Sequence, residues 1–273
     1  MLTGCSSGGT DAPAGGSGAS AAARTAEPSQ VPSGAARPAP AGTGSGSPGP
    51  GPSASGSQLV TELDEAKQPR TAAEARDLLG RVMLDEGVFG PQARRATPFE
   101  SDPRRWPVLD RNCVWQTDAL PADVLATTTR HFRIPAGDGH GTVRLDVTVT
   151  VHHDRAGSGW ETARAMEEVL RCPDQQLTAD ERLRKIWGNS DYFGQQGNVW
   201  TEDAFAESGE YVNEQDGTTG PYTWSQSQVG PVTLAVAGKG AAGFPDKELT
   251  SLIVKGTSEM TFKARKALAK EAP

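Results

Sequence analysis

The first 58 residues contain no aromatic side chain, and the chain as a whole has few: three Tyr, seven Phe and six Trp in 273 residues. Between residues 6 and 58, 43 of 53 residues are Gly, Ala, Ser or Pro. Such a segment cannot bury enough apolar surface to offset the entropy lost on ordering. We therefore expect residues 6–58 to be a disordered linker, and residues 59–273 to form a globular domain large enough to build its own core.

Long apolar runs and basic clusters are also missing. No stretch of 18 consecutive apolar residues is present that would span a bilayer. The formal net charge is −7, and the charges within residues 6–58 cancel, so the acidity belongs to the globular part. An acidic domain without a basic stripe repels phosphate backbones, which argues against nucleic acid as a partner.

Cysteine is scarce, with three in the chain, and the first has a distinctive setting. The residues Met-Leu-Thr-Gly precede Cys5, and a Ser/Gly run follows it. This pattern resembles a bacterial lipobox, in which small residues precede a cysteine that receives a diacylglyceryl group. The resemblance implies a lipid-anchored protein on the outer face of the cell membrane, with residues 6–58 as its tether. Two or three acyl chains are enough for stable anchoring.

The lipobox interpretation needs a signal peptide, which carries a charged segment and about 7 to 15 apolar residues. Only four residues precede Cys5, so we expect a start upstream of Met1 or a chain that has been trimmed, and we treat residues 1–5 as the remnant. The alternative is a chance match within the Gly/Ser-rich tail of a cytosolic protein.

The two other cysteines form an even pair once Cys5 carries lipid. In an oxidising compartment we expect Cys113 and Cys172 to form a disulfide. Closing that loop would stabilise the fold by about 4 kcal/mol. The alternatives are two buried free thiols or a catalytic cysteine. The two do not form a Cys-x-x-Cys motif, which argues against a redox role.

Capping boxes predict where helices begin, because a Ser or Thr and a Glu three residues later satisfy free backbone N–H groups. They occur at Thr71–Glu74, Ser158–Glu161 and Thr178–Glu181. The first helix should run to about Asp85, and the second should end at Arg171. Residues 88–112 contain several prolines and are expected to be a loop. The second helix should have an apolar face formed by Trp160, Ala163, Met166, Val169 and Leu170. The third box should start a short helix that bears Leu183, Ile186 and Trp187. A last helix should run from about Pro245 to Leu268.

Strands are predicted from alternation and β-branched residues. Residues 142–152 alternate valine or leucine with polar residues, which indicates one buried and one wetter face. Residues 127–134 form a second strand, and residues 221–228 and 231–237 form a hairpin. Residues 197–224 suggest short strands or loops. Together these predict an α+β fold, a twisted antiparallel sheet with helices packed on one face.

The order of these features resembles one known family. Leu78-Leu79 precedes Asn112-Cys113, a valine-rich strand follows, and the next helix ends in Leu170-Arg171-Cys172 before a late apolar strand (232–237) and a C-terminal helix. This arrangement is similar to actinobacterial lipoproteins that resemble the extracellular sensor domain of the mycobacterial PknH-type kinase. The resemblance implies a V-shaped cleft on the sheet and ligand binding without catalysis.

Motifs for catalysis or metal binding are largely absent. His152 and His153 would point to opposite faces of a strand and so would not share an ion easily. Ser158 sits between two glycines but lacks the spacing of a nucleophile elbow, and we interpret it as a helix cap. Glu167 and Glu168 are interpreted as solvated. We therefore predict no catalytic residue, no metal site and no cofactor.

The remaining candidates concern a ligand. Arg144 lies on the polar face of a predicted strand and is a candidate anion contact; the alternative is an ordinary salt bridge. Aromatic residues in the C-terminal half could stack on an amphiphile or a glycan, or could simply pack in the core. Tyr222 and Trp224 are the chosen ligand-binding candidates from a group that also includes Trp200 and Tyr211.

These features predict a lipid-anchored, extracytoplasmic, monomeric binding or sensor domain that is not an enzyme. The alternative is an envelope hydrolase acting on a cell-wall or lipid substrate. An enzyme should place a perturbed carboxylate or histidine in a cleft, whereas a binding domain should show an apolar groove without one.

Overall fold

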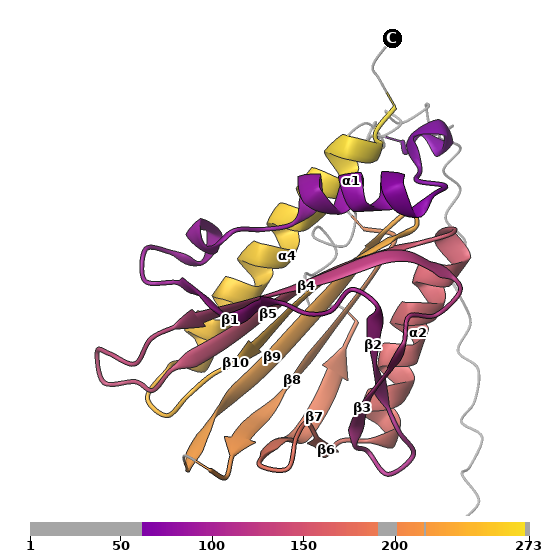
Figure 1. Cartoon of the computed structure of the whole chain (residues 1–273). Coiled ribbons are helices and arrows are strands. Elements are labelled where there is room, and N and C mark those ends of the chain that lie inside the picture. The colour runs from indigo at the N-terminus through magenta and orange to yellow at the C-terminus, as the bar shows by residue number, and fades with distance from the viewer. Residues whose placement is uncertain (1–61, 191–200, 216, 271–273) are drawn as a thin grey trace, which may run out of the picture. The chain divides into compact units, whose positions relative to one another are not determined.

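The computed structural model describes residues 62–190, 201–215 and 217–270. Within these residues the chain forms an eight-stranded antiparallel sheet, a separate two-stranded hairpin and three α-helices (Figure 1). The predicted α+β class with an antiparallel sheet is confirmed. Cys5, the linker 6–58 and Trp200 lie outside the described residues.

The sheet brings together strands that are far apart in the sequence. Its order is β1-β4-β5-β10-β9-β8-β7-β6, so β5 pairs with β10 at the centre, with Val151 opposite Val232. The predicted hairpin at Gly230 is confirmed as β9–β10. The strands of the sheet are β1 (Arg94–Glu100), β4 (Val124–Ile134), β5 (Val143–His152), β6 (Gln175–Gln176), β7 (Glu181–Asn189), β8 (Asp203–Asn213), β9 (Thr218–Val229) and β10 (Val232–Lys239), and the hairpin comprises β2 (Arg105–Leu109) and β3 (Trp115–Ala119).

One face of the sheet is apolar and is covered by two helices. Every second residue of β5, from Val143 to Val151, is buried there, as the alternation predicts. Helices α1 (Ala72–Val82) and α4 (Asp246–Leu268) pack on this face. Thr71 and Glu74 form the predicted capping box at the start of α1. Two 3₁₀ turns, η2 (Glu65–Lys67) and η3 (Glu86–Phe89), flank this helix.

The third helix, α2 (Arg155–Arg171), contacts the opposite face, a placement that the sequence did not predict. Gln226 and Gln228 of β9 and Thr233 of β10 are buried on this face. Gln226 donates from Nε2 to Thr162 Oγ1 over 2.9 Å, and Gln228 donates from Nε2 to Ser158 Oγ over 2.8 Å. Hydrogen bonds between buried polar groups therefore help to hold α2 on the sheet.

The start of α2 differs from the prediction. Asp154, not Ser158, is the N-cap, and its side chain accepts a hydrogen bond from the backbone of Gly157. Ser158 lies one turn inside the helix and donates to the carbonyl oxygen of Gly230 over 2.7 Å. The predicted apolar helix face is wrong in part, because Trp160 and Leu170 are 71% and 85% exposed. The first half of the helix contacts the sheet through Ser158 and Thr162, whereas its second half packs Met166 and Val169 against apolar residues of β7 and β8.

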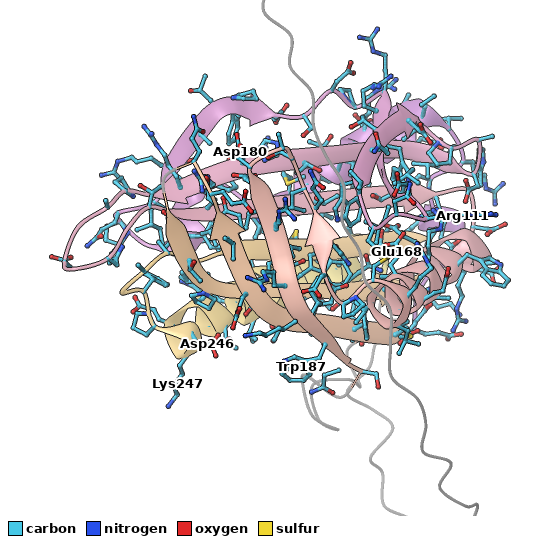
Figure 2. All side chains as sticks on the ribbon, turned by 90° about the horizontal axis from the view of Figure 1, so that it is seen from below. Arg111, Glu168, Asp180, Trp187, Asp246 and Lys247 are labelled. Carbon is cyan, nitrogen blue, oxygen red and sulfur yellow. A yellow bond between two sulfur atoms is a disulfide. The ribbon has the colours of Figure 1, made fainter. Side chains whose placement is uncertain are left out.

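The predicted helix after Thr178 is wrong. Thr178 Oγ1 does accept hydrogen bonds from the backbone N–H groups of Asp180 and Glu181, as a cap would, but strand β7 follows. Pairing with β8 outweighs the local helix signal. Leu183 is buried against α2, whereas Trp187 points outward and is 56% exposed (Figure 2).

Two stretches contain more strand than predicted. Residues 88–112 include β1 and β2, whose side chains are mostly exposed and so show no clear alternation. The stretch 197–224 holds all of β8 and the first half of β9, which are long strands and not short ones. Consecutive residues of β8 and of the second half of β9 are buried, so these strands are covered on both faces there and lose the period of two.

Candidate functional site

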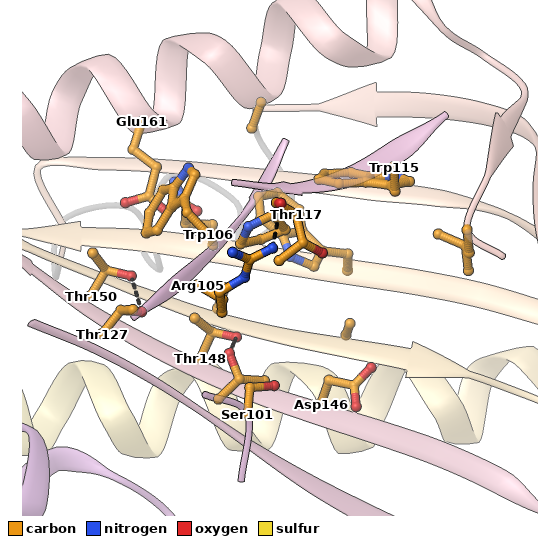
Figure 3. Close-up of a pocket in the computed structure, with 18 of the residues that line it drawn as sticks. Ser101, Arg105, Trp106, Trp115, Thr117, Thr127, Asp146, Thr148, Thr150 and Glu161 are labelled. Atoms are coloured by element: carbon orange, nitrogen blue, oxygen red, sulfur yellow. Dashed lines mark hydrogen bonds between the residues drawn. The ribbon is translucent and has the colours of Figure 1, made fainter. Parts of the chain in front are cut away.

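A cleft of about 420 Å³ opens on the polar face of the sheet, between α2 and the β2–β3 hairpin (Figure 3). Its volume lies within the roughly 300–1,000 Å³ of typical ligand sites. The hairpin contributes two of its aromatic side chains and strand β9 contributes two more: Trp106, Trp115, Tyr222 and Trp224. Of the three predicted ligand-binding residues, Tyr222 and Trp224 thus lie in one cleft.

The hairpin is fixed to the end of α2 by covalent and polar contacts. Cys113, in the hairpin turn, forms the predicted disulfide with Cys172, the C-cap of α2; their Cα atoms are 5.5 Å apart. Arg171 donates to the carbonyl oxygen of Asp110 over 2.8 Å. Trp115 Nε1 donates to Gln175 Oε1 over 2.8 Å. The wall that carries the two hairpin tryptophans is therefore held in place by residues next to the disulfide.

Hydroxyl groups line the floor of the cleft. Thr127 and Thr150 pair across β4 and β5 with their Oγ1 atoms 3.0 Å apart, and Thr129 and Thr148 do so at 2.9 Å (Figure 3). These four residues come from the polar side of the strand register. A floor of threonines presents both methyl groups and hydroxyl oxygens to a bound molecule.

Two carboxyl groups are removed from water, Glu168 in the lining of the cleft and Glu207 next to Tyr222. Burial raises the pKa of Glu168 to about 7, although Arg164 and Arg171 act in the opposite direction. Glu168 therefore is not the solvated residue that the sequence suggested: it lines the cleft from α2. Burial also raises the pKa of Glu207 to about 8, and the Tyr222 hydroxyl donates to its Oε2 over 3.3 Å.

The third predicted ligand-binding residue, Arg144, does not line this cleft. It borders an adjoining cavity of about 600 Å³, and its Nη1 donates to the hydroxyl of Tyr211 over 2.7 Å. Glu181 lies 3.9 Å from the same nitrogen. These contacts fit the alternative interpretation of Arg144, an ordinary salt bridge. Tyr211 is fully buried and belongs to the packing beneath α2.

Three residues that no sequence motif singled out, Ser101, His131 and Asp146, lie together in the cleft. His131 Nδ1 lies 2.7 Å from Asp146 Oδ1, and His131 Nε2 lies 2.8 Å from Ser101 Oγ. All three line the cleft. His131 and Asp146 are directly opposite each other in the β4–β5 register. His131 and Asp146 lie on two strands that the sequence predicted, but only the pairing of those strands shows that the two side chains meet.

Asp146 is ionised at neutral pH. Burial would raise the pKa of its carboxyl, but the charge of Lys239 and the hydrogen bond with His131 lower it to about 2. Lys239 Nζ lies 3.3 Å from Oδ2, which leaves Oδ1 to the histidine. The carboxylate is therefore oriented through both of its oxygens.

His152 and His153 give no metal site. His152 is buried, and its Nε2 lies 2.7 Å from Glu161 Oε2. Among residues 62–190, 201–215 and 217–270, no group of three His, Cys, Asp or Glu side chains is arranged to hold a metal ion. Nor is any helix in this part of the chain long and apolar enough to cross a membrane.

Comparison with known proteins leaves the family open. No protein-family model and no curated protein matches the sequence. Among solved structures, the fold is similar to an uncharacterized protein from Mycobacterium smegmatis described as an Rv0999 ortholog. The TM-score is 0.33 and the identity 12%, over 73% of this chain and 97% of that chain. This likeness assigns neither a fold family nor an activity.

Proposed function

We propose that this chain is a lipid-anchored, extracytoplasmic binding domain whose ligand occupies the cleft between α2, the sheet and the β2–β3 hairpin. The cleft itself carries this proposal: it combines aromatic walls with a hydroxyl-bearing floor. Aromatic faces pack on sugar rings or acyl chains, while hydroxyl and carboxyl groups exchange hydrogen bonds with a polar ligand. The ligand class is an amphiphile or a glycan.

The location is proposed from the N-terminus and from the cysteines. Cys5 would carry the lipid, and residues 6–58 would be the tether, with a root-mean-square span of roughly 40 Å. The disulfide between Cys113 and Cys172 supports an oxidising compartment, because such bonds are rare in the cytosol. The kinship with PknH-type sensor domains is part of the same proposal, and a cleft on the sheet is what that resemblance implies.

The binding proposal is tested by native mass spectrometry of the full chain purified from its own host. We expect a small molecule to accompany the wild type and to be depleted in Trp224→Ala, which removes one aromatic wall. Trp187→Ala is the matched control, since Trp187 is exposed outside the cleft. A wild type that carries no small molecule under gentle ionisation, or a Trp224→Ala variant that carries as much, would contradict the proposal.

The anchor is tested separately by cell fractionation. We expect the wild type in the membrane fraction with the mass of a diacylglyceryl group added, and Cys5→Ala in the soluble fraction without it. A wild type that remains soluble and unmodified would overturn the location while leaving the cleft proposal standing.

A further inference from the structure

Ser101, His131 and Asp146 form a chain of hydrogen bonds at the edge of the cleft. Ser101 Oγ lies 2.8 Å from His131 Nε2, and His131 Nδ1 lies 2.7 Å from Asp146 Oδ1. Figure 3 shows Ser101 and Asp146 on the side of the cleft away from Glu161. Each ring nitrogen of the histidine therefore has its own partner, one hydroxyl and one carboxylate.

These contacts assign the roles of the two ring nitrogens. A carboxylate only accepts hydrogen bonds, so Nδ1 must carry the hydrogen that points to Asp146. In the neutral ring Nε2 is then an acceptor, and the Ser101 hydroxyl donates to it. This is the arrangement in which an imidazole removes a proton from a serine while a carboxylate holds it in the right tautomer.

The backbone holds the three residues in this geometry. His131 on β4 and Asp146 on β5 are register partners, so the sheet itself sets their separation. Ser101 directly follows β1, and its backbone N–H donates to the carbonyl oxygen of Thr129 over 3.0 Å. Two of the three side chains thus lie on strands and the third is fixed to β4, and none depends on a long loop.

The serine is accessible while its partners are shielded. Ser101 is exposed and lines the cleft, whereas the side chains of His131 and Asp146 are 26% and 23% exposed. The carboxylate is also braced by Lys239 on its second oxygen. A substrate lying along the aromatic wall near Trp106 would therefore reach the serine from the open side of the cleft.

We propose that Ser101, His131 and Asp146 make the cleft an esterase site, with Ser101 as nucleophile, His131 as general base and acid, and Asp146 as the positioning carboxylate. The substrate class is a carboxylic ester whose apolar part packs in the cleft. This goes beyond the proposed function, since binding needs only the aromatic walls and the hydroxyl floor. It would replace the prediction of a domain without catalytic residues.

The reaction balances with water as the co-reactant. Ser101 Oγ bonds to the acyl carbon as its proton passes to His131 Nε2, and the ester C–O bond breaks as that proton moves to the leaving alcohol. Water then attacks the acyl-serine, giving its proton to Nε2. The Oγ–acyl bond breaks and the serine recovers a proton. One ester and one water become one acid and one alcohol.

The first test is covalent labelling of the full chain with a fluorophosphonate, which loses fluoride to a serine activated by histidine. We expect the wild type to gain one phosphonyl group, with peptide mapping placing it on Ser101. Ser101→Ala should remain unlabelled, and His131→Gln should label at least about 100-fold more slowly. Ser251→Ala is the matched control, because Ser251 is an exposed serine on α4, and it should label like the wild type.

Hydrolysis of p-nitrophenyl butyrate provides a second readout. Ser101→Ala should lower the initial rate at least about 100-fold while retaining the wild-type circular dichroism spectrum and unfolding midpoint. Because Ser101 is exposed, this variant should fold normally. A wild type that gains no label and hydrolyses no ester, or one labelled equally after Ser101→Ala, would overturn the esterase proposal. If native mass spectrometry still finds a ligand in the cleft, the binding function survives that result.

Discussion

Glu161 on α2 accepts a hydrogen bond from His152 on β5, with 2.7 Å between Oε2 and Nε2. The same oxygen accepts the hydroxyl of Thr233 over 2.6 Å. His152 is 2% exposed, so this contact is shielded from water. One carboxylate therefore joins α2 to β5 and β10, on the face of the sheet opposite α1 and α4.

Glu161→Ala should destabilise the fold, because it leaves the donors of both His152 and Thr233 buried without an acceptor. We expect the free energy of unfolding to fall by roughly 2–4 kcal/mol. Urea unfolding followed by circular dichroism measures this. Glu167→Ala, on the same helix, removes only an exposed pair with Arg171 and should change stability by less than about 0.5 kcal/mol. Equal effects of the two substitutions would show that the buried contact contributes nothing.

Reduction of the disulfide should loosen the hairpin. Cys113 and Cys172 are separated by 59 positions in sequence, and opening a loop of that size should lower the free energy of unfolding by about 2–4 kcal/mol. The measurement is urea unfolding with and without dithiothreitol in a Cys5→Ser background. Cys113→Ala/Cys172→Ala in the same background should be less stable and insensitive to the reductant. A midpoint that dithiothreitol does not move would contradict this prediction.

Stability should fall as pH rises because of Glu207. Burial raises the pKa of this carboxyl from 4.5 to about 8 in the folded protein. Between those pH values the folded state holds a proton that the unfolded chain has released. The stabilisation that Glu207 contributes is therefore fully present below about pH 4.5 and is lost as the pH rises to 8. One such group contributes a slope of about 1.4 kcal/mol per pH unit.

Glu207→Gln should flatten this pH dependence when unfolding is measured from pH 5 to 8. Glu168, whose pKa is raised to about 7, acts in the same direction, so a shallower fall should remain. An unchanged slope in Glu207→Gln would show that the group ionises in the folded protein as it does in water.

Two glycines should respond in opposite ways to alanine. A Cβ atom at Gly220 would lie 2.5 Å from backbone atoms of Gly240 and Ala241, so Gly220→Ala should cost roughly 1–3 kcal/mol. A Cβ at Gly80 on α1 meets nothing within 4 Å, and Gly80→Ala should stabilise the fold by about 0.5–1 kcal/mol through helix propensity. Thermal unfolding compares the two, and a stabilising Gly220→Ala would show that the strands can separate without penalty.

Local patterns predicted some elements well. The capping box at Thr71 and the apolar stripe after it predict α1, and the alternation over 142–152 predicts β5. The same kind of signal failed at Thr178, where the capping hydrogen bonds exist but the chain continues as β7. Because β7 is paired with β8, a contact some 25 residues away in sequence decides the outcome.

The candidate site was only partly foreseeable. Tyr222 and Trp224 were singled out as aromatics and do line the cleft, but Trp106 lay in a region expected to be loop. Arg144 shares a strand with Asp146, yet its side chain reaches a different cavity. Glu168 could be recognised as desolvated only once α2 was seen to cover the polar face of the sheet.

By itself the sequence predicted the α+β class, because local periodicity suffices for it, and it favoured a disulfide between Cys113 and Cys172 from the count of cysteines. Only the tertiary structure decided which side chains share a site. The meeting of Ser101, His131 and Asp146 requires β1, β4 and β5 to pair in one register. A slip by one residue would turn every side chain to the other face, and no local pattern encodes that choice.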